Sequence, residues 1–212
     1  MRKIVVIGHG GHSKVVQDTI QSLGGYEFIA ILDDRYTDVS CKNGIQFGPV
    51  SEAKKLATDP GVVFTIAIGT NWVREKIAKE LFDYGAMFET LIHPFSFVSP
   101  SARIGPGSVV MAGAIINADA VIGSHVIVNS GSIVEHDNFI ADYAHISPGS
   151  VMTGNVTVGT GAHVGAGAKV IPGKTIGDWS VIGAGSVVIH DIPDEETAIG
   201  VPAVVKSNVL LK

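Results

Sequence analysis

Cysteine, charged residues and aromatic residues are all scarce in this chain of 212 residues. Charged residues make up 17% and aromatic residues 7%, and the formal net charge is −5. Surfaces that bind nucleic acid carry an excess of lysine and arginine, so this composition argues against a nucleic-acid partner. Cys41 is the single cysteine, which excludes an intramolecular disulfide and favours a reducing compartment.

Long apolar runs are also missing, although hydrophobic residues make up 46% of the chain and the mean hydropathy is +0.35. No apolar stretch approaches the roughly 20 residues of a membrane-spanning helix. The first apolar run, Ile4–Ile7, is too short for the core of a signal peptide. We therefore predict a soluble cytoplasmic protein without a membrane span, long enough for one or two domains.

An aliphatic residue recurs at every sixth position from Val98 to Val188 without interruption. This period indicates a solenoid with three short sides per coil, so that residues eighteen apart lie one coil above another, about 4.8 Å away. The series is Val98, Ile104, Val110, Ile116, Ile122, Val128, Val134, Ile140, Ile146, Met152, Val158, Val164, Val170, Ile176, Ile182 and Val188.

The residues between these aliphatics follow the same period. The fourth residue after each aliphatic is usually alanine or serine, as at Ala114 and Ser132, which suits a tight inner corner. Glycine, asparagine or aspartate often falls just after the aliphatic or two places later, where we expect turns that need positive φ.

The first 92 residues instead alternate strand and helix patterns. We expect strands at Ile4–Ile7, Phe28–Leu32 and Val62–Ile68, and helices at Lys14–Leu23 and Trp72–Tyr84. This order predicts a small parallel α/β sheet of Rossmann-like type. The domains are accordingly 1–92 and 93–212, joined at a proline-containing segment.

Ligands of parallel sheets bind beyond the carboxyl ends of the strands. Three such loops are therefore expected to converge on one pocket: the glycine-rich turn Gly8–Ser13, the pair Asp33-Asp34, and Gly69–Asn71. Gly8-x-Gly10 suits a backbone that approaches a phosphate closely at a helix N-terminus. Ser13 stands where the dinucleotide fingerprint has its third glycine, which argues against NAD.

The eighteen-residue coil sorts the histidines of the solenoid. His145 and His163 should stack on one face, and Gly154 should lie at the same corner as His136, one coil on. His136 and His145 are half a coil apart, so we do not expect one chain to bring them together. We expect His125 and His163 to be closer to ordinary exposed corner residues of the solenoid.

These motifs resemble the left-handed parallel β-helix of the hexapeptide-repeat acyltransferases. With the N-terminal α/β half, the chain resembles NeuD-type sugar O-acetyltransferases and, more closely, bacterial UDP-4-amino-sugar N-acetyltransferases of the bacillosamine pathway. The resemblance rests on Gly8-His9-Gly10-Gly11-His12, Leu32-Asp33-Asp34, Ala67-Ile68-Gly69-Thr70-Asn71, Val134-Glu135-His136-Asp137, His145-Ile146-Ser147 and Gly200-Val201-Pro202-Ala203.

The resemblance implies a homotrimer with intersubunit active sites that transfers an acetyl group from acetyl-CoA to the amine of a nucleotide-linked amino sugar, with no metal. His136 would be the general base, Asp137 would polarise it where close relatives carry glutamate, and Asn129 would orient the amine. The remaining implied roles are contacts to acetyl-CoA by His145, Gly154, Ala166 and Thr175, contacts to the diphosphate and sugar by Gly10, Gly11, His12 and Gly69, and contacts to the base or ribose by Asp33 and Asp34.

Three other interpretations remain open from the sequence. The same scaffold serves O-acetylation of a sialic-acid-type sugar, in which a hydroxyl would depend more on His136. A zinc enzyme of the γ-carbonic-anhydrase type would use His136, His145 and His163 as ligands. A non-catalytic nucleotide-sugar-binding subunit would keep the pocket and lack the chemistry.

Overall fold

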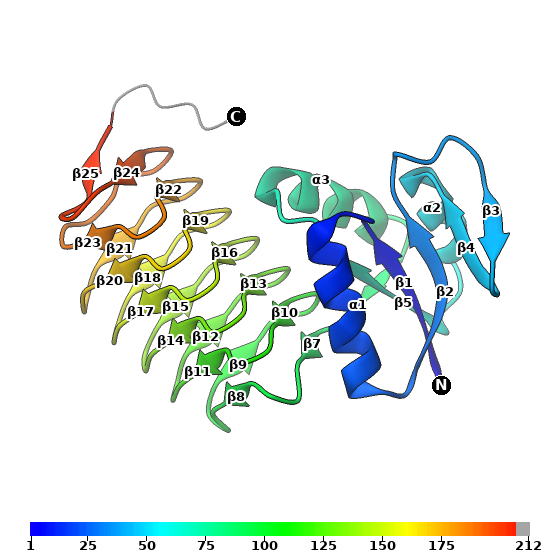
Figure 1. Ribbon diagram of the computed structural model, residues 1–212, viewed down its shortest axis with the longest axis horizontal. Helices are drawn as coiled ribbons and strands as arrows, with labels where there is room; N and C mark the ends of the chain where they lie inside the picture. Colours follow the sequence, from blue (N-terminus) through cyan, green and yellow to red (C-terminus); the bar gives the residue numbers. More distant parts are fainter. Residues whose placement is uncertain (207–212) are drawn as a thin grey trace. The chain divides into compact units, whose positions relative to one another are not determined.

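The computed structural model describes residues 1–206 and divides into two compact units, the first spanning Met1–Pro94 and the second beginning at Phe95 (Figure 1). The boundary lies two residues beyond the one expected from the proline-containing segment. The predicted second domain runs to residue 212, and its last part, 207–212, lies outside the described residues.

The first unit is built on a sheet with strand order β3-β4-β2-β1-β5-β6. Strands β1, β2, β4, β5 and β6 run parallel, and β3 pairs antiparallel with β4. Helix α1 packs on β1 and β2, and α3 packs on β5. The elements are β1 (Arg2–Ile7), α1 (Gly11–Leu23), β2 (Tyr26–Leu32), β3 (Ser40–Lys42), β4 (Ile45–Gly48), the 3-10 turn η1 (Val50–Glu52), α2 (Ala53–Leu56), β5 (Val62–Ile66), α3 (Asn71–Phe82), β6 (Met87–Phe88) and β7 (Leu91–Ile92).

All five predicted elements of this unit form, and each has at least one end that differs from the expected residue by one to three positions. Helix α1 begins at Gly11, three residues earlier than expected, so Gly11 to Ser13 belong to its first turn. Strand β5 ends at Ile66, two residues before the expected end at Ile68. Low helix propensity of glycine hid the first difference, and the continuous apolar run hid the second. The short strands β3, β4 and β6 were not predicted.

In the second unit each six-residue repeat forms a two-residue strand followed by a turn. The second residue of every strand is the aliphatic of the repeat, and from Val110 to Val188 these side chains are fully buried inside a three-sided prism. Val98 and Ile104, in the first coil, are half-buried. Strands eighteen residues apart pair in parallel, as Ile127 does with His145. The predicted solenoid is therefore confirmed.

The three sides of the prism are three parallel sheets whose coils stack in sequence order (Figure 1). The first contains β10 (Val109–Val110), β13 (Ile127–Val128), β16 (His145–Ile146), β19 (His163–Val164), β22 (Val181–Ile182), β24 (Thr197–Ile199) and the antiparallel β25 (Val204–Val205). The second contains β8 (Phe97–Val98), β11 (Ile115–Ile116), β14 (Ile133–Val134), β17 (Val151–Met152), β20 (Lys169–Val170) and β23 (Val187–Val188). The third contains β9 (Arg103–Ile104), β12 (Val121–Ile122), β15 (Phe139–Ile140), β18 (Thr157–Val158) and β21 (Thr175–Ile176).

The turns of the prism correct one detail of the sequence interpretation. Positive φ occurs at the third residue after the aliphatic, for example at Asp137 (59°) and Tyr143 (60°). Glycines directly after the aliphatic do not need positive φ. A Cβ at Gly123 would collide with the carboxylate of Asp142 in the next coil and would lie 2.7 Å from the backbone nitrogen of the same residue. Those glycines are therefore required by the close approach of stacked coils.

Candidate functional site

A cavity of about 370 Å³ lies at the carboxyl ends of β1, β2 and β5. Its walls are Gly8, Gly10, Gly11, His12, Asp33, Ala67, Ile68 and Gly69. Gly8 is required by the fold, because its φ is +104° and a Cβ would lie 2.8 Å from the carbonyl oxygen of Ala67. A Cβ at Gly10, Gly11 or Gly69 would meet nothing within 4 Å, and none of these three has positive φ. Their missing side chains leave open space beside the N-terminus of α1, which suits an anionic ligand.

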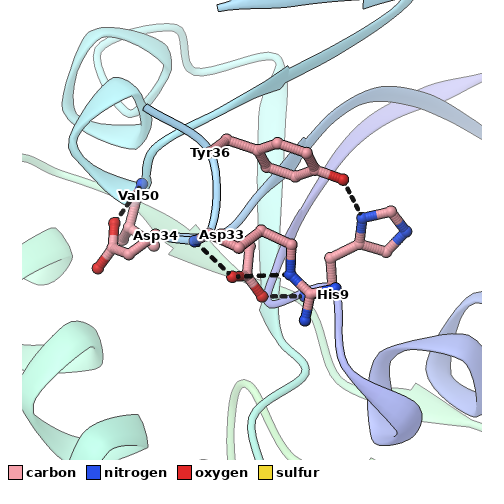
Figure 2. A network of polar contacts seen from close by, with 6 residues as sticks. His9, Asp33, Asp34, Tyr36 and Val50 are labelled. Carbon is pink, nitrogen blue, oxygen red and sulfur yellow. Dashed lines mark hydrogen bonds and ion pairs between the residues drawn. The ribbon is translucent and has the colours of Figure 1, made fainter. Parts of the chain in front are cut away.

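The carboxylate of Asp33 accepts hydrogen bonds from two nearby residues, His9 and Arg35 (Figure 2). It accepts from the backbone N–H of His9 at 2.6 Å, and from the backbone and side chain of Arg35 at 2.9 and 3.2 Å. Partial burial works to raise the pKa of Asp33, but these bonds outweigh it and hold the pKa below its ordinary value. The ring of His9 in turn lies 2.5 Å from the hydroxyl of Tyr36. Asp33 therefore shapes the glycine-rich turn as an ionised carboxylate.

Asp34 does not join Asp33 in this cavity, contrary to the convergence expected from the sequence. Its carboxylate accepts the backbone N–H of Val50 at 2.9 Å (Figure 2). Asp34 also lines a second cavity of about 330 Å³. Trp72, from the first turn of α3, also lines that second cavity. Successive residues leave a strand end in opposite directions, which separates the two carboxylates.

Beneath the first cavity lies an arginine that the sequence analysis did not single out. Arg74 is 1% exposed, and its guanidinium donates to the carbonyl oxygens of Ile68 and Gly69 at 2.9 and 3.3 Å and to the side chain of Asn71 at 2.9 Å. Burial, and then the positive charge of Arg74, lower the pKa of His12 to about 4. His12 is therefore a neutral imidazole at pH 7.

The position of Arg74 carried a signal in the sequence. The buried residues of α3 are Asn71, Arg74, Ala78 and Leu81, whose spacing defines one face of a helix. An arginine on the buried face of an amphipathic helix is unusual and marks a specific polar environment.

In the prism, His136 and Asp137 lie in the turn between β14 and β15. Nδ1 of His136 is 2.8 Å from Oδ2 of Asp137, and both side chains are about 60% exposed (61% and 59%). The hydrogen bond to Asp137 comes first among the causes that raise the pKa of His136; the charges of Asp137 and Glu135 add to it, and desolvation opposes it. Because a carboxylate only accepts, Nδ1 carries the hydrogen and Nε2 is left as an acceptor.

Two further residues fix this corner. A Cβ on Gly154, eighteen residues on, would lie 2.6 and 2.7 Å from Cε1 and Nε2 of His136, so bare backbone lies against the basic edge of the ring. The buried amide of Asn138 donates to the carbonyl oxygens of Glu135 and Thr153 at 2.7 and 2.9 Å. Asn138 takes a position that is usually alanine or serine, and this departure from the period was the signal that the sequence analysis missed.

A second polar group lies on a different side of the prism. His145 and His163 lie one above the other on this side, as their eighteen-residue offset predicts, with ring centroids 4.8 Å apart and ring planes tilted by 41°. Nε2 of His145 lies 3.0 Å from the amide of Asn129, and Nε2 of His163 lies 3.0 Å from the hydroxyl of Ser147. Asn129 is thus hydrogen-bonded to His145, and the structure gives no contact between this group and His136.

The two other residues expected to contact a cofactor lie towards the C-terminal coils. Ala166 is an exposed turn residue whose carbonyl accepts the N–H of Gly185 at 2.8 Å. Thr175 begins β21 with its side chain exposed, and its N–H donates to the carboxylate of Asp191 at 2.9 Å. His125, which we expected to be an exposed corner residue, is buried instead, and its ring stacks on that of Tyr143 in the next coil with centroids 5.4 Å apart.

No group of three histidine, cysteine, aspartate or glutamate side chains is placed to hold a metal ion within residues 1–206. His136 lies in a turn, whereas His145 and His163 lie on the sheet that contains β16 and β19. A single described chain therefore does not assemble the histidine ligands that the zinc interpretation requires. Among the same residues, no helix is both long and apolar enough to cross a membrane.

Both units of the chain are similar to known proteins. Residues 3–81 match the PglD N-terminal domain family. UDP-N-acetylbacillosamine N-acetyltransferase of Bacillus subtilis (strain 168) is 47% identical over 115 residues, which cover 53% of this chain and about half (52%) of that protein. The GDP-perosamine N-acetyltransferase of Caulobacter crescentus, solved as a mutant with CoA and GDP-perosamine, is 40% identical, with a TM-score of 0.90 and 97% of each chain covered. The acetyltransferase domain of PglB from Neisseria gonorrhoeae FA1090, solved with acetyl coenzyme A, is also 40% identical, with a TM-score of 0.90 over 97% of this chain and 99% of that one.

A Rossmann-like parallel sheet followed by a left-handed β-helix of six-residue repeats defines a class of two-unit hexapeptide-repeat proteins. Strand pairing, coil period and the matches along nearly the whole chain agree on that class. Within it, the chain belongs to the NeuD/PglD-type family of sugar acetyltransferases.

Proposed function

We propose that the protein transfers the acetyl group of acetyl-CoA to the amine of a nucleotide-linked amino sugar, in glycan or surface-polysaccharide biosynthesis. The observation that carries the proposal is the arrangement of His136. Its ring is held by Asp137 on one side, its Nε2 edge lies against the bare backbone of Gly154, and its side chain is open to solvent. The relatives solved with CoA or acetyl coenzyme A support acetyl-CoA as the co-substrate.

The chemistry follows from what an amide-forming acyl transfer needs. The amine nitrogen attacks the thioester carbonyl carbon, the N–C bond forms, and the C–S bond breaks. Nε2 of His136 takes the proton that the amine loses and returns one to the departing CoA thiolate. The imidazolium that forms in between is stabilised by the carboxylate of Asp137. The backbone N–H of Gly154 is the donor for the developing negative charge on the carbonyl oxygen.

The first unit supplies the second substrate site in this proposal. Gly10, Gly11 and Gly69 lack side chains where neither φ nor packing demands it, so the cavity has room for a diphosphate at the N-terminus of α1. His12 would donate or accept a hydrogen bond there as a neutral ring. Asp33 would contribute by holding the turn and facing the ribose. Asp34 would reach the base only from the neighbouring cavity.

The acetyl-CoA contacts are assigned to His145, Ala166 and Thr175. Because the amide of Asn129 is hydrogen-bonded to His145, we assign Asn129 the role of orienting that ring, in place of direct contact with the amine. His136 and His145 lie in different parts of one prism, so a shared site needs a second copy of the chain.

A homotrimer would bring them together, and one side of the prism suits such an interface. The outward-facing residues of β8, β11, β14 and β17 are Phe97, Ile115, Ile133 and Val151, stacked in register. Phe97 is 54% exposed. A continuous outward column of large apolar residues on a β-helix face favours contact with another subunit.

Acetyl-CoA turnover, followed as released thiol, tests the reaction against UDP-, GDP- and CMP-linked sugars with 3-amino, 4-amino or only hydroxyl acceptors. We expect turnover with one amino sugar and an N-acetyl product by mass spectrometry. Turnover confined to hydroxyl sugars would replace the proposal with O-acetylation. Undiminished turnover by His136→Ala would show that the base is misassigned.

Light scattering coupled to size exclusion tests the assembly. We expect a mass of three chains, and smaller species for Ile133→Glu, which places a charge in the apolar column. Thr157→Glu, on an exposed position of another side, serves as the control. A wild-type monomer with full activity would refute the intersubunit site.

A further inference from the structure

The cavity in the first unit has an unusual electrostatic composition for an anion site. The residues that line it include one acid, Asp33, and no lysine or arginine. His12 adds no charge at neutral pH, because burial and Arg74 lower its pKa to about 4. Two exposed cations stand two residues from the lining in sequence: Arg35, which is paired with Asp33 at 3.2 Å, and Lys14, which lies in α1 and is not among the lining residues.

Arg74 lies directly behind this lining. It donates to the carbonyl oxygens of Ile68 and Gly69, two residues that form the wall, so its guanidinium and the cavity are on either side of one stretch of backbone. Its charge also acts on His12, on the opposite wall. The position is thus within electrostatic reach of whatever fills the cavity, while burial keeps the guanidinium from touching it.

We propose that Arg74 is a positioning residue for the diphosphate of the nucleotide-linked sugar. It fixes the Ile68–Gly69 turn and supplies, through the wall of the cavity, the positive charge that the lining residues lack. This proposal rests on the proposed function. A fixed charge in a buried site is screened little by salt or water, and it stays in place without ordering a flexible side chain on binding.

The alternative is that Arg74 only holds the turn together. The two roles predict different losses of affinity for different ligands. A collapsed turn would weaken the binding of every ligand of the cavity, whereas a lost charge would weaken only the binding of ligands that carry phosphate. Calorimetric titration of UDP, GDP and the nucleosides uridine and guanosine into the full-length protein separates them. Arg74→Gln removes the charge, Arg74→Lys keeps it without the planar fork, and Lys79→Gln removes an exposed charge from the same helix as a control.

We expect Arg74→Gln to weaken the binding of the nucleoside diphosphate by about tenfold or more, while the affinity for the nucleoside stays within about twofold of the wild-type value. For a nucleotide sugar that the wild-type protein acetylates, Arg74→Gln should raise the KM for that sugar. The kcat and the KM for acetyl-CoA should stay near their wild-type values. Arg74→Lys should restore most of the diphosphate affinity, and Lys79→Gln should match wild type.

Equal weakening of diphosphate and nucleoside, or no weakening of either, would overturn the role of the charge. If Arg74→Gln does not fold, Arg74→Lys decides: diphosphate affinity within threefold of wild type supports the proposal, and a loss beyond tenfold overturns it. If the wild type binds acetyl-CoA but neither UDP nor GDP, the nucleotide site itself is wrong and this role falls with it. Failure of Arg74 alone, with wild-type diphosphate binding intact, leaves the proposed function standing.

Discussion

If His136 is the general base that we propose, substituting Gly154 by alanine should strongly lower the rate of acetyl transfer without unfolding the protein. The added Cβ would lie 2.6 Å from Cε1 of His136, which is 0.8 Å inside the 3.4 Å at which ordinary contact begins. Gly154 does not have positive φ, so alanine fits the backbone, and its N–H donor is preserved. The ring of His136 is the part that must move, by about 1 Å, and a misplacement of that size costs on the order of 100-fold in rate.

Stability should respond little to the same change. The side chain of His136 is 61% exposed, so the ring can rotate into solvent without disturbing the prism core. We expect a shift in Tm of less than about 2 °C, as for surface substitutions. The assay is thiol release at saturating substrates, together with thermal unfolding followed by circular dichroism.

A double substitution provides the control. If Gly154→Ala acts by displacing the base, it should lower kcat in the wild-type background and add nothing to His136→Ala. An equal further loss in the His136→Ala background would show that the added methyl group obstructs acetyl-CoA instead. A kcat within twofold of wild type would refute the close packing of Gly154 on the base.

Three other outcomes are expected. Asp137→Asn should lower kcat/KM and move its acidic limb to lower pH, because removing the carboxylate removes the hydrogen bond and charge that raise the pKa of His136; an unchanged pH profile would contradict this pairing. The folded-state pKa of His12, about 4, lies below its unfolded value of 6.5, so between these two pH values the unfolded chain binds more protons than the folded chain. The neutral His12 therefore contributes about 3 kcal/mol to the free energy of unfolding above pH 6.5, and this contribution is lost as the pH falls towards 4. Urea midpoints across that pH range should fall less for His12→Gln than for wild type, and parallel curves would argue against a neutral buried ring. Ile176→Ala should lower the free energy of unfolding in urea by about 2–5 kcal/mol, because the side chain is buried in the prism. Thr175→Ala, at the exposed neighbouring position on β21, should lower it by less than about 0.5 kcal/mol. Similar losses for the two variants would contradict the assignment of Ile176 as inward-facing and Thr175 as outward-facing.

The prism was predictable because its physics is local and repeated. Each coil buries one aliphatic residue per side, so a fixed period of six converts directly into contacts between residues eighteen apart, such as His145 and His163. A departure from the period was equally readable in principle, and Asn138 is the case that the sequence analysis passed over. The sheet of the first unit was predictable only in outline, because β3, β4 and β6 are short and lack a periodic signal.

In the candidate site too, some features followed from the repeat and others required the folded structure. Offsets within the solenoid placed Gly154 at the corner of His136, and the resemblance supplied chemical roles for both. The need for glycine at Gly123 was not predictable in this way, because it depends on how closely the coils stack.

By itself the sequence determined the coil period, the inward residues, the order of the two units and the family to which the chain belongs. Only the tertiary structure decided which polar groups meet, because hydrogen bonds such as Asn129 to His145 depend on side-chain directions that no period specifies. The same is true of the separation of Asp33 from Asp34 and of the guanidinium of Arg74 behind the cavity wall. A buried charge is placed by the carbonyl oxygens that surround it, and those oxygens come into position only when the chain has folded.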